Sequence, residues 1–360
     1  MSTPTSNHPA RLEFDSARLE TYLREAVPGL TGPMRLQRIG GGQSNPTFFV
    51  DFDNRSMVLR KQPPGQLLPS AHAVDREARI MQALAATDVP VPKIVLFETD
   101  RSIVGTPFYV MDTIKGRVFA EYALPDLSAG ERRAMYLSMA ETMAKLHRVD
   151  WQAIGLEGFG KPGNFFQRQV ARWSRQWQDA RVRDNPWLDQ LIAWLPANIP
   201  GGEATTICHG DFRMGNLMFH PTEPRVIAVL DWELSTLGHP LADVAYNCLA
   251  WRTLPSEYGG ILGLDHEALG IPSEADYLQH YQRFAGPDVA GGETVAIFHY
   301  VFSLFRFAVI FEGIAARAAA GNANADNAAS VGHLGIALAK RAVALIESAS
   351  EQPHSILPAT

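Results

Sequence analysis

The pattern of apolar and polar residues divides the chain into a part rich in strands and a later part rich in helices. Short β-branched and aromatic runs, bounded by glycine, proline and asparagine, predict strands at residues 34–39, 47–52, 57–61 and 108–111. Apolar residues at helical spacing predict helices at residues 16–25, 71–86, 128–148, 274–285, 294–320 and 324–350. The segment 294–320 is very apolar but is interrupted by charges at Arg306, Glu312 and Arg317, which favours a buried helix over a membrane span.

The transition between the two parts falls at residues 112–116, where the last predicted strand of the first part runs into Asp-Thr-Ile-Lys-Gly. A chain of 360 residues is longer than one compact core usually holds. We therefore expect two domains: residues 1–113, built on an antiparallel sheet, and residues 114–360, which are mostly helical. This is an α+β organisation.

Composition narrows the range of partners and compartments. Hydrophobic residues make up 46% of the chain and charged residues 19%, which is typical of soluble globular proteins. The net charge of -6 gives no overall attraction to nucleic acid or to an anionic membrane, so we expect neither as a partner. Cys208 and Cys248 lie in apolar segments, and the N-terminus lacks a basic stretch followed by an apolar one, so we expect a cytoplasmic protein without disulfides.

The segment 208–243 carries the densest set of candidate functional groups. Asp211 follows a short apolar run, Asn216 comes five residues later, and Asp231 ends the apolar run 226–230. A proline-rich turn separates two short strands here, which predicts a hairpin with these three side chains at one end. Two carboxylates and an amide suit Mg²⁺, which prefers few carboxylates together with substrate phosphates. Aspartates that only cap turns would explain one of these residues more easily than the whole set.

A glycine-rich turn, Gly-Gly-Gly-Gln-Ser-Asn at residues 40–45, joins the first two predicted strands. Because it does not open a helix, it is not a dinucleotide-binding fingerprint. Such a hairpin can donate backbone N–H groups to nucleotide phosphates, although an ordinary loop has the same composition. The third strand ends in Arg60 and Lys61, which alternation places on opposite faces. Glu77 on the following helix can pair with one of them, the alternative being a solvated surface position.

Together these motifs resemble the aminoglycoside phosphotransferase and choline kinase-like family, small-molecule relatives of the eukaryotic protein kinases. The resemblance rests on His-Gly-Asp-x₄-Asn at residues 209–216, on the strand that ends in Asp231, and on the glycine hairpin, and it extends over residues 30–320. The sequence LRKQPPG at residues 59–65 and a segment rich in tryptophan and arginine look most like the kinase-like domain fused to acyl-CoA dehydrogenases in animals.

The resemblance implies a bilobal protein-kinase-like fold, with a small antiparallel-sheet lobe and a larger, mostly helical lobe. It also implies an ATP- and Mg²⁺-dependent phosphotransferase that acts on a hydroxyl group of a small molecule. Asp211 would be the catalytic base, and Asn216 and Asp231 would hold Mg²⁺. Arg213 lies where protein kinases place a lysine against the γ-phosphate, and a guanidinium there would stabilise the transferring group.

The implied nucleotide-binding residues are Gly41, Gly42, Ser44, Asn45, Arg60, Lys61, Glu77, Asp112 and Ile114. Arg60, paired with Glu77, is the best match to the basic residue that touches the α- and β-phosphates. Lys61 is the second candidate, because many relatives have lysine there and arginine is not equivalent. The backbone at Asp112 and Ile114 would meet the adenine. His209 and Asp243 look like a structural pair, and His239 stands where relatives commonly have aspartate.

The acceptor and the activity are open to other interpretations. Arginines recur at Arg168, Arg172, Arg175, Arg181 and Arg183. They could form a basic wall that faces an anionic or acyl hydroxy substrate. More commonly, such a run is a solvated helix face. A cationic aminoglycoside would need an acidic acceptor site and is less favoured. A nucleotide-binding pseudokinase or regulatory module is the alternative function. A metal-dependent hydrolase built on His209 would require further histidine or aspartate ligands at close spacing.

Overall fold

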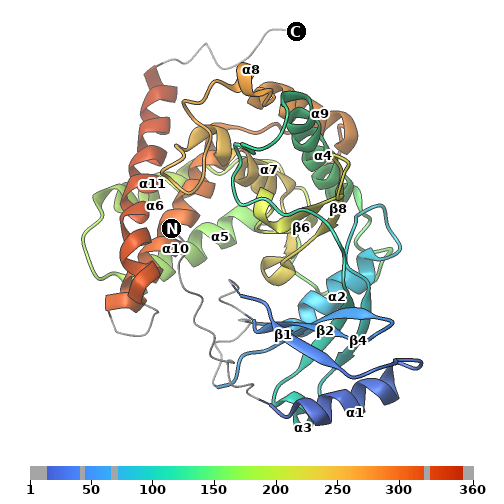
Figure 1. Ribbon diagram of the computed structural model, residues 1–360. Helices are drawn as coiled ribbons and strands as arrows, with labels where there is room; N and C mark the ends of the chain where they lie inside the picture. The colour runs from blue at the N-terminus through green and yellow to red at the C-terminus, as the bar shows by residue number, and fades with distance from the viewer. Residues whose placement is uncertain (1–13, 41–44, 66–71, 320–324, 352–360) are drawn as a thin grey trace, which may run out of the picture. The chain divides into compact units, whose positions relative to one another are not determined.

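The computed structural model of the protein describes residues 14–40, 45–65, 72–319 and 325–351 (Figure 1). Residue contacts divide the chain into two compact units. Unit 1 comprises Met1–Ala86 and Val91–Lys115, and unit 2 comprises Thr87–Pro90 and Gly116–Thr360. The chain therefore passes from one unit to the other between Lys115 and Gly116.

Unit 1 is built on a five-stranded antiparallel sheet with the order β1-β2-β3-β5-β4. Its strands are β1 (Arg35–Arg38), β2 (Thr47–Asp51), β3 (Ser56–Lys61), β4 (Ile94–Glu98) and β5 (Phe108–Asp112). Its helices are α1 (Ser16–Ala26), α2 (Val74–Leu84) and α3 (Arg101–Val104). The apolar pattern did not predict β4, an edge strand in which every residue is only partly buried.

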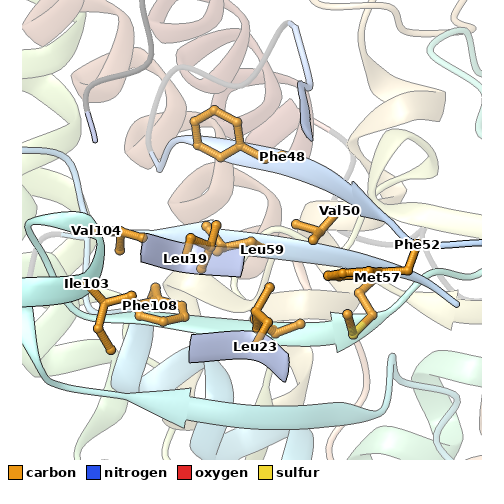
Figure 2. Close-up of a cluster of buried hydrophobic side chains, with 11 residues drawn as sticks. Leu19, Leu23, Phe48, Val50, Phe52, Met57, Leu59, Ile103, Val104 and Phe108 are labelled. Carbon is orange, nitrogen blue, oxygen red and sulfur yellow. The ribbon is translucent and has the colours of Figure 1, made fainter. Parts of the chain in front are cut away.

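One face of this sheet packs against α1. Figure 2 shows Leu19 and Leu23 of α1 in the same buried cluster as Met57 and Leu59 of β3. Since side chains alternate along a strand, Lys61 points to this same apolar face. Lys61 is 2% exposed, and its Nζ lies 5.4 Å from the centre of the Phe14 ring. The preceding residue, Arg60, lies on the opposite face of β3.

Unit 2 is mostly helical, as predicted, and the α+β class is confirmed. Its helices are α4 (Ala129–Arg148), α5 (Phe165–Ala180), α6 (Pro186–Ala197), α7 (Pro240–Cys248), α8 (His266–Leu269), α9 (Glu274–Ala285), α10 (Ile297–Ala319) and α11 (Ala325–Glu351). Two small antiparallel sheets pair β6 (Thr206–Cys208) with β9 (Thr236–Gly238) and β7 (Leu217–Phe219) with β8 (Val226–Val229). The 3₁₀ turn η1 (Met214–Asn216) leads into β7.

Helix α10 lies beside α11 and forms much of the core of unit 2 (Figure 1). Among the described residues it is the one helix that could cross a membrane by length and composition. However, 72% of its most apolar stretch is buried inside the protein. A core helix of a folded domain has this pattern, as the charges along the sequence predicted.

A buried ion pair ties α10 to the segment before α6. Glu312 of α10 is 1% exposed and accepts hydrogen bonds from Arg183 at 2.8 and 2.9 Å and from Asn185 at 3.0 Å. Asn185 also caps α6, because its side-chain oxygen accepts from the Leu188 N–H at 3.3 Å. A carboxylate this deeply buried needs both partners, since an unpaired buried charge is costly.

We therefore predict that Arg183→Ala lowers the free energy of unfolding by about 2–4 kcal/mol, because Glu312 loses its charged partner. Urea unfolding measures this change. The matched control is Arg181→Ala, which removes an exposed arginine paired with Asp184 and Asp189 and should leave the unfolding midpoint nearly unchanged. Equal losses of unfolding free energy in the two variants would show that the buried Arg183–Glu312 pair stabilises the protein no more than an exposed ion pair does.

Candidate active site

A buried carboxylate on α7 holds the loop that follows β6. Asp243 accepts hydrogen bonds from the backbone N–H groups of His209 at 2.6 Å and Gly210 at 2.9 Å. Nε2 of His147 in α4 lies 3.5 Å from Asp243, and the His147 Nδ1 lies 2.7 Å from the Tyr281 hydroxyl oxygen. Burial raises the pKa of Asp243, but His147 and the backbone donors outweigh it and the pKa is lowered. The carboxylate is therefore ionised.

Glycine is required at position 210 for two reasons. Its φ of +83° lies in the left-handed region that favours glycine. A Cβ at this position would also lie 2.6 Å from the Leu234 carbonyl oxygen. The tight turn of this loop therefore depends on Gly210 as well as on Asp243.

His209 links the loop to the end of β8. Its Nδ1 accepts from the Asp211 backbone N–H at 3.2 Å, so its Nε2 carries the proton and donates to the Leu230 carbonyl at 2.9 Å. Since Leu230 precedes Asp231, one imidazole ring fixes two functional segments. Both ring nitrogens are occupied, so His209 is not available as a metal ligand. This geometry argues against the hydrolase alternative.

The Asp211 carboxylate receives three side-chain donors. The Tyr246 hydroxyl donates to Oδ1. Asn216 Nδ2 donates to Oδ2 at 2.7 Å, and Arg213 Nε donates to the same oxygen at 3.3 Å. Because Oδ2 takes two of these donors and Oδ1 takes one, Oδ1 keeps more capacity to accept a proton from another group.

The β7–β8 hairpin brings Asn216 and Asp231 to the same end. Leu217 pairs with Val229, and the Leu230 N–H donates to the Asn216 carbonyl at 2.8 Å. Asp231 has a φ of +63°, a left-handed conformation that is unusual for a residue other than glycine and often marks a functional position.

This hairpin end fits a hard cation bound together with phosphate. Asn216 Nδ2 is used by Asp211, so its Oδ1 is the atom left to face a cation. Within the described part of the chain, no three His, Cys, Asp or Glu side chains form a metal cluster. One amide oxygen and one carboxylate suit Mg²⁺, which completes its coordination with water and substrate phosphates.

In unit 1, polar side chains contact the Glu77 carboxylate of α2 on the sheet face opposite α1. Arg60 Nε lies 2.9 Å from the Glu77 carboxylate, so the predicted pair is present. Tyr109 donates to the same carboxylate at 2.9 Å, and Asn45 Nδ2 donates to it at 2.7 Å. Glu77 is 1% exposed. Since Lys61 points to the other face of β3, the geometry favours Arg60 for the role of the basic residue.

The residues predicted to bind nucleotide in and beside the glycine-rich turn differ in where they lie. Gly41, Gly42 and Ser44 lie outside the described residues. The Asn45 side chain lies between Glu77 and His72, with its Oδ1 3.1 Å from His72 Nδ1, and so supports Glu77. The structure places Asn45 as a brace rather than as a side chain turned toward a ligand.

Asp112 and Ile114 lie at and just beyond the end of β5. The Asp112 carboxylate pairs with Arg55 at 2.7 Å, and its N–H donates to the Lys93 carbonyl at 2.9 Å. An adenine contact at Asp112 would therefore use its carbonyl oxygen. Ile114 follows in an irregular segment whose backbone is not part of the strand.

A cavity of about 340 Å³ in unit 2 lies beside Arg213. Its lining residues include Tyr122, Tyr246, Tyr258, Leu249, Phe307 and Leu338. Two charged residues take part in the lining, Arg213 and Glu257, and Glu257 pairs with Arg341 at 2.6 Å. The cavity is therefore mostly aromatic and aliphatic, with one cation close to Asp211. No pattern in the sequence indicates this cavity.

The arginines of the 168–183 run do not form one wall. Arg168 donates to the backbone carbonyls of Lys161 and Gly163. Arg181 pairs with exposed aspartates, and Arg183 pairs with buried Glu312. None of the five arginines lines the cavity.

Arg172 shares an aromatic neighbour with Arg306 of α10. Its guanidinium lies 5.3 Å from the centre of the Trp173 ring, and that of Arg306 lies 5.7 Å from the same ring. Arg306 in turn donates to the Gly210 carbonyl. Burial lowers the pKa of Arg172, and so does the neighbouring charge of Arg306. Two cations therefore lie close together beside the loop of Asp211.

Known proteins are similar to this chain in sequence and in fold. The sequence profile of the phosphotransferase enzyme family matches residues 35–270. The mouse acyl-CoA dehydrogenase family member 10 is 44% identical over 329 residues, which cover 90% of this chain. A crystal structure of a Ralstonia eutropha protein, provisionally described as an aminoglycoside phosphotransferase, is 43% identical with a TM-score of 0.84. It covers 93% of this chain and 99% of the other.

The chain belongs to the phosphotransferase enzyme family. The predictions of this family and of a small-molecule kinase are thereby confirmed. A choline kinase from Cryptosporidium parvum has a TM-score of 0.63 at 13% identity, covering 94% of this chain and 97% of the other, which confirms the kinase-like fold. The chain spans 30% of the length of the mouse relative, so it corresponds to one part of that longer protein.

Sequence reasoning missed several residues that organise the site of this family member. Tyr246 and Asn247 lie three and four residues after Asp243, so they share its helix face. Asn247 Nδ2 donates to the Phe212 carbonyl at 3.0 Å. This spacing could have been recognised once α7 was predicted. Arg306 gives no local signal, because it reaches the loop from a helix far away in the sequence.

His239, the departure from the common family pattern, caps α7. Its Nδ1 accepts from the Leu241 N–H at 3.3 Å, and its Nε2 lies 3.6 Å from the Glu293 carboxylate. Its ring stacks on that of His299 with 6.1 Å between ring centres. Burial, followed by the influence of a neighbouring histidine, lowers the pKa of each ring to about 4. Both histidines are therefore neutral at pH 7.

These two histidines predict that the protein loses stability in mild acid. In the unfolded chain they bind protons near pH 6.5, but in the folded chain only near pH 4, so between these values the unfolded chain holds more protons and stability rises with pH. Relative to neutral pH, each histidine should lower the free energy of unfolding by about 2 kcal/mol at pH 5. We expect the melting temperature to fall from pH 7 to pH 5, and to fall less in His239→Asn, which keeps a capping oxygen. The same pH dependence in that variant would contradict this account.

Proposed function

We propose that this kinase transfers the γ-phosphoryl group of ATP, with Mg²⁺, to a hydroxyl group of a small molecule bound in the cavity beside Arg213. The observation that carries the proposal is the environment of Asp211. One of its oxygens is held by Asn216 and Arg213, and the other keeps capacity for a proton. An aminoglycoside phosphotransferase with a TM-score of 0.56 and 19% identity was crystallised with AMP-PNP and hygromycin B, which supports a nucleotide co-substrate for this fold.

In this proposal each residue has a separate role. Asp211 Oδ1 accepts the proton of the acceptor hydroxyl. Burial lowers the pKa of Arg213, but nearby Asp211 and three tyrosines raise it by more, so the net shift is upward. The guanidinium therefore stays charged and can stabilise the transferring phosphoryl group. Asn216 and Asp231 would hold Mg²⁺, which supplies neutralisation of the phosphate charge when bound. Positioning and charge stabilisation suffice for phosphoryl transfer, so no covalent enzyme intermediate is required.

On the nucleotide side, Arg60 is the proposed partner of the phosphates. Glu77 fixes its guanidinium, and Glu77 is itself held by Tyr109 and Asn45. A nucleotide-binding pseudokinase would share these contacts in unit 1. The arrangement of Asp211, Asn216 and Arg213 in unit 2 favours the enzyme over that alternative.

The cavity favours an acceptor with an apolar body and an anionic group. Aromatic and aliphatic side chains line most of it, and Glu257 is already paired with Arg341, so carboxylates that would bind a polycationic aminoglycoside are lacking among its described lining residues. Arg172 and Arg306 provide positive charge nearby, and no ion pair joins either of them to a carboxylate in the described part of the chain. The names of the longer relatives, acyl-CoA dehydrogenase family members, support an acyl hydroxy compound.

The test of the proposed function is an ATP-consumption screen over hydroxy acids, their acyl-CoA esters, amino alcohols, sugars and aminoglycosides. We expect turnover with an anionic or acyl hydroxy compound, and a loss of kcat of at least about 100-fold in Asp211→Asn, because the base is removed while the packing is kept. Activity that survives this substitution would refute the assigned base. Mg²⁺-dependent ATP binding without turnover on any acceptor would favour the pseudokinase.

The anionic preference has its own test. Arg172→Ala should raise the KM for an anionic acceptor about tenfold and leave the KM for ATP unchanged, because a charged partner of the acceptor is lost. Arg175→Ala is the matched control, since Arg175 lies on the same helix and takes no part in the described contacts with Trp173. If both variants bind every anionic acceptor as tightly as the wild type does, the preference is wrong.

A further inference from the structure

Tyr246 occupies a position that no motif assigns. Its hydroxyl donates to Asp211 Oδ1, the oxygen with capacity left for a proton. Its ring stacks on Phe307 with 5.1 Å between ring centres and an interplanar angle of 3°. Arg306 lies 5.6 Å from the centre of the same ring. Contacts from three directions therefore fix the side chain, which is 6% exposed.

The Tyr246 hydroxyl acts as a donor toward the carboxylate. Burial, and then the charge of Asp211, raises the pKa of Tyr246 well above its usual range. The phenol therefore keeps its proton throughout the physiological range. A phenol that keeps its proton and donates to one carboxylate oxygen fixes how that carboxylate is turned.

Tyr246 also belongs to the wall of the cavity beside Arg213. An acceptor that fills this cavity meets the Tyr246 ring, while its hydroxyl has to approach the Asp211 oxygen that the Tyr246 hydroxyl already contacts. One side chain thus links the shape of the acceptor site to the orientation of the base. Asn216 and Arg213 hold the other carboxylate oxygen and do not make this link.

We propose that Tyr246 is a positioning residue that aims Asp211 Oδ1 at the acceptor hydroxyl. The proposal rests on the proposed function. In the reaction, the acceptor oxygen forms a bond to the γ-phosphorus as its proton passes to Asp211 Oδ1. The bond from the γ-phosphorus to the bridging oxygen breaks, and ADP leaves with that electron pair. Tyr246 keeps its own proton and changes no bond.

The kinetic test is Tyr246→Phe, which keeps the ring and its stacking on Phe307 but removes the hydroxyl. We expect kcat to fall about tenfold or more, with the KM for ATP unchanged. The KM for the acceptor should change little, because the ring that lines the cavity is kept. A merely structural wall residue would instead raise the acceptor KM and leave kcat in place, which would overturn the proposal.

The matched control is Tyr258→Phe. Tyr258 lines the same cavity, and no hydrogen bond from its hydroxyl to Asp211 is present in the described structure. This variant should lose much less kcat than Tyr246→Phe does, whatever its effect on acceptor affinity. An equal fall in kcat in both variants would show a general effect of the cavity and would contradict a specific role for Tyr246.

A readout that needs no turnover separates this proposal from the proposed function. Crystal structures of the wild type and of Tyr246→Phe compare the orientation of the Asp211 carboxylate. We expect the carboxylate to turn in the variant, and an unchanged orientation overturns the Tyr246 proposal. A turned carboxylate in a protein that phosphorylates no acceptor would support the Tyr246–Asp211 coupling and refute the phosphotransferase activity.

Discussion

The ionised carboxylate of Asp243, buried inside unit 2, is the constraint on which the candidate site depends. It accepts from two successive backbone N–H groups, those of His209 and Gly210, and so fixes the path of the chain just before Asp211. Burying a carboxylate is costly, and here the donors and His147 offset that cost. The loop carries Asp211, the proposed base, on a backbone that cannot relax without leaving this charge unpaired.

Side chains from three helices converge on this loop. Helix α7 supplies Asp243, Tyr246 and Asn247, which contact four successive residues from 209 to 212. Helix α4 supports the Asp243 carboxylate through His147, and α10 reaches the Gly210 carbonyl through Arg306. The proposed base is thus positioned by packing between helices, while the proposed metal ligands are positioned by the β7–β8 hairpin. His209 connects the two through its ring.

The parts of the site that lie in short sequence motifs were predictable, because local structure alone brings them together. Asn216 and Asp231 flank one hairpin and Asp211 lies on the loop just before it, while the alternation along β3 limited the basic residue to Arg60 or Lys61. The arginine run was not interpretable in this way, because the partner of Arg183 is Glu312, which comes from a distant helix. The cavity beside Arg213 could not be predicted for the same reason, because Tyr122, Tyr258 and Leu338 meet only after the helices pack. The edge strand β4 lacked a buried face and therefore a clear pattern.

The division of labour between base and metal ligands is the central claim, and a metal position tests it most directly. Crystals grown with Mn²⁺ and a non-hydrolysable ATP analogue would locate the metal by its anomalous scattering. The account predicts a metal bound by Asn216 Oδ1 and the Asp231 carboxylate, with Asp211 outside its coordination shell and His209 still bonded to the Leu230 carbonyl. A metal coordinated by His209 or Asp211, or bound away from the β7–β8 hairpin, would contradict it.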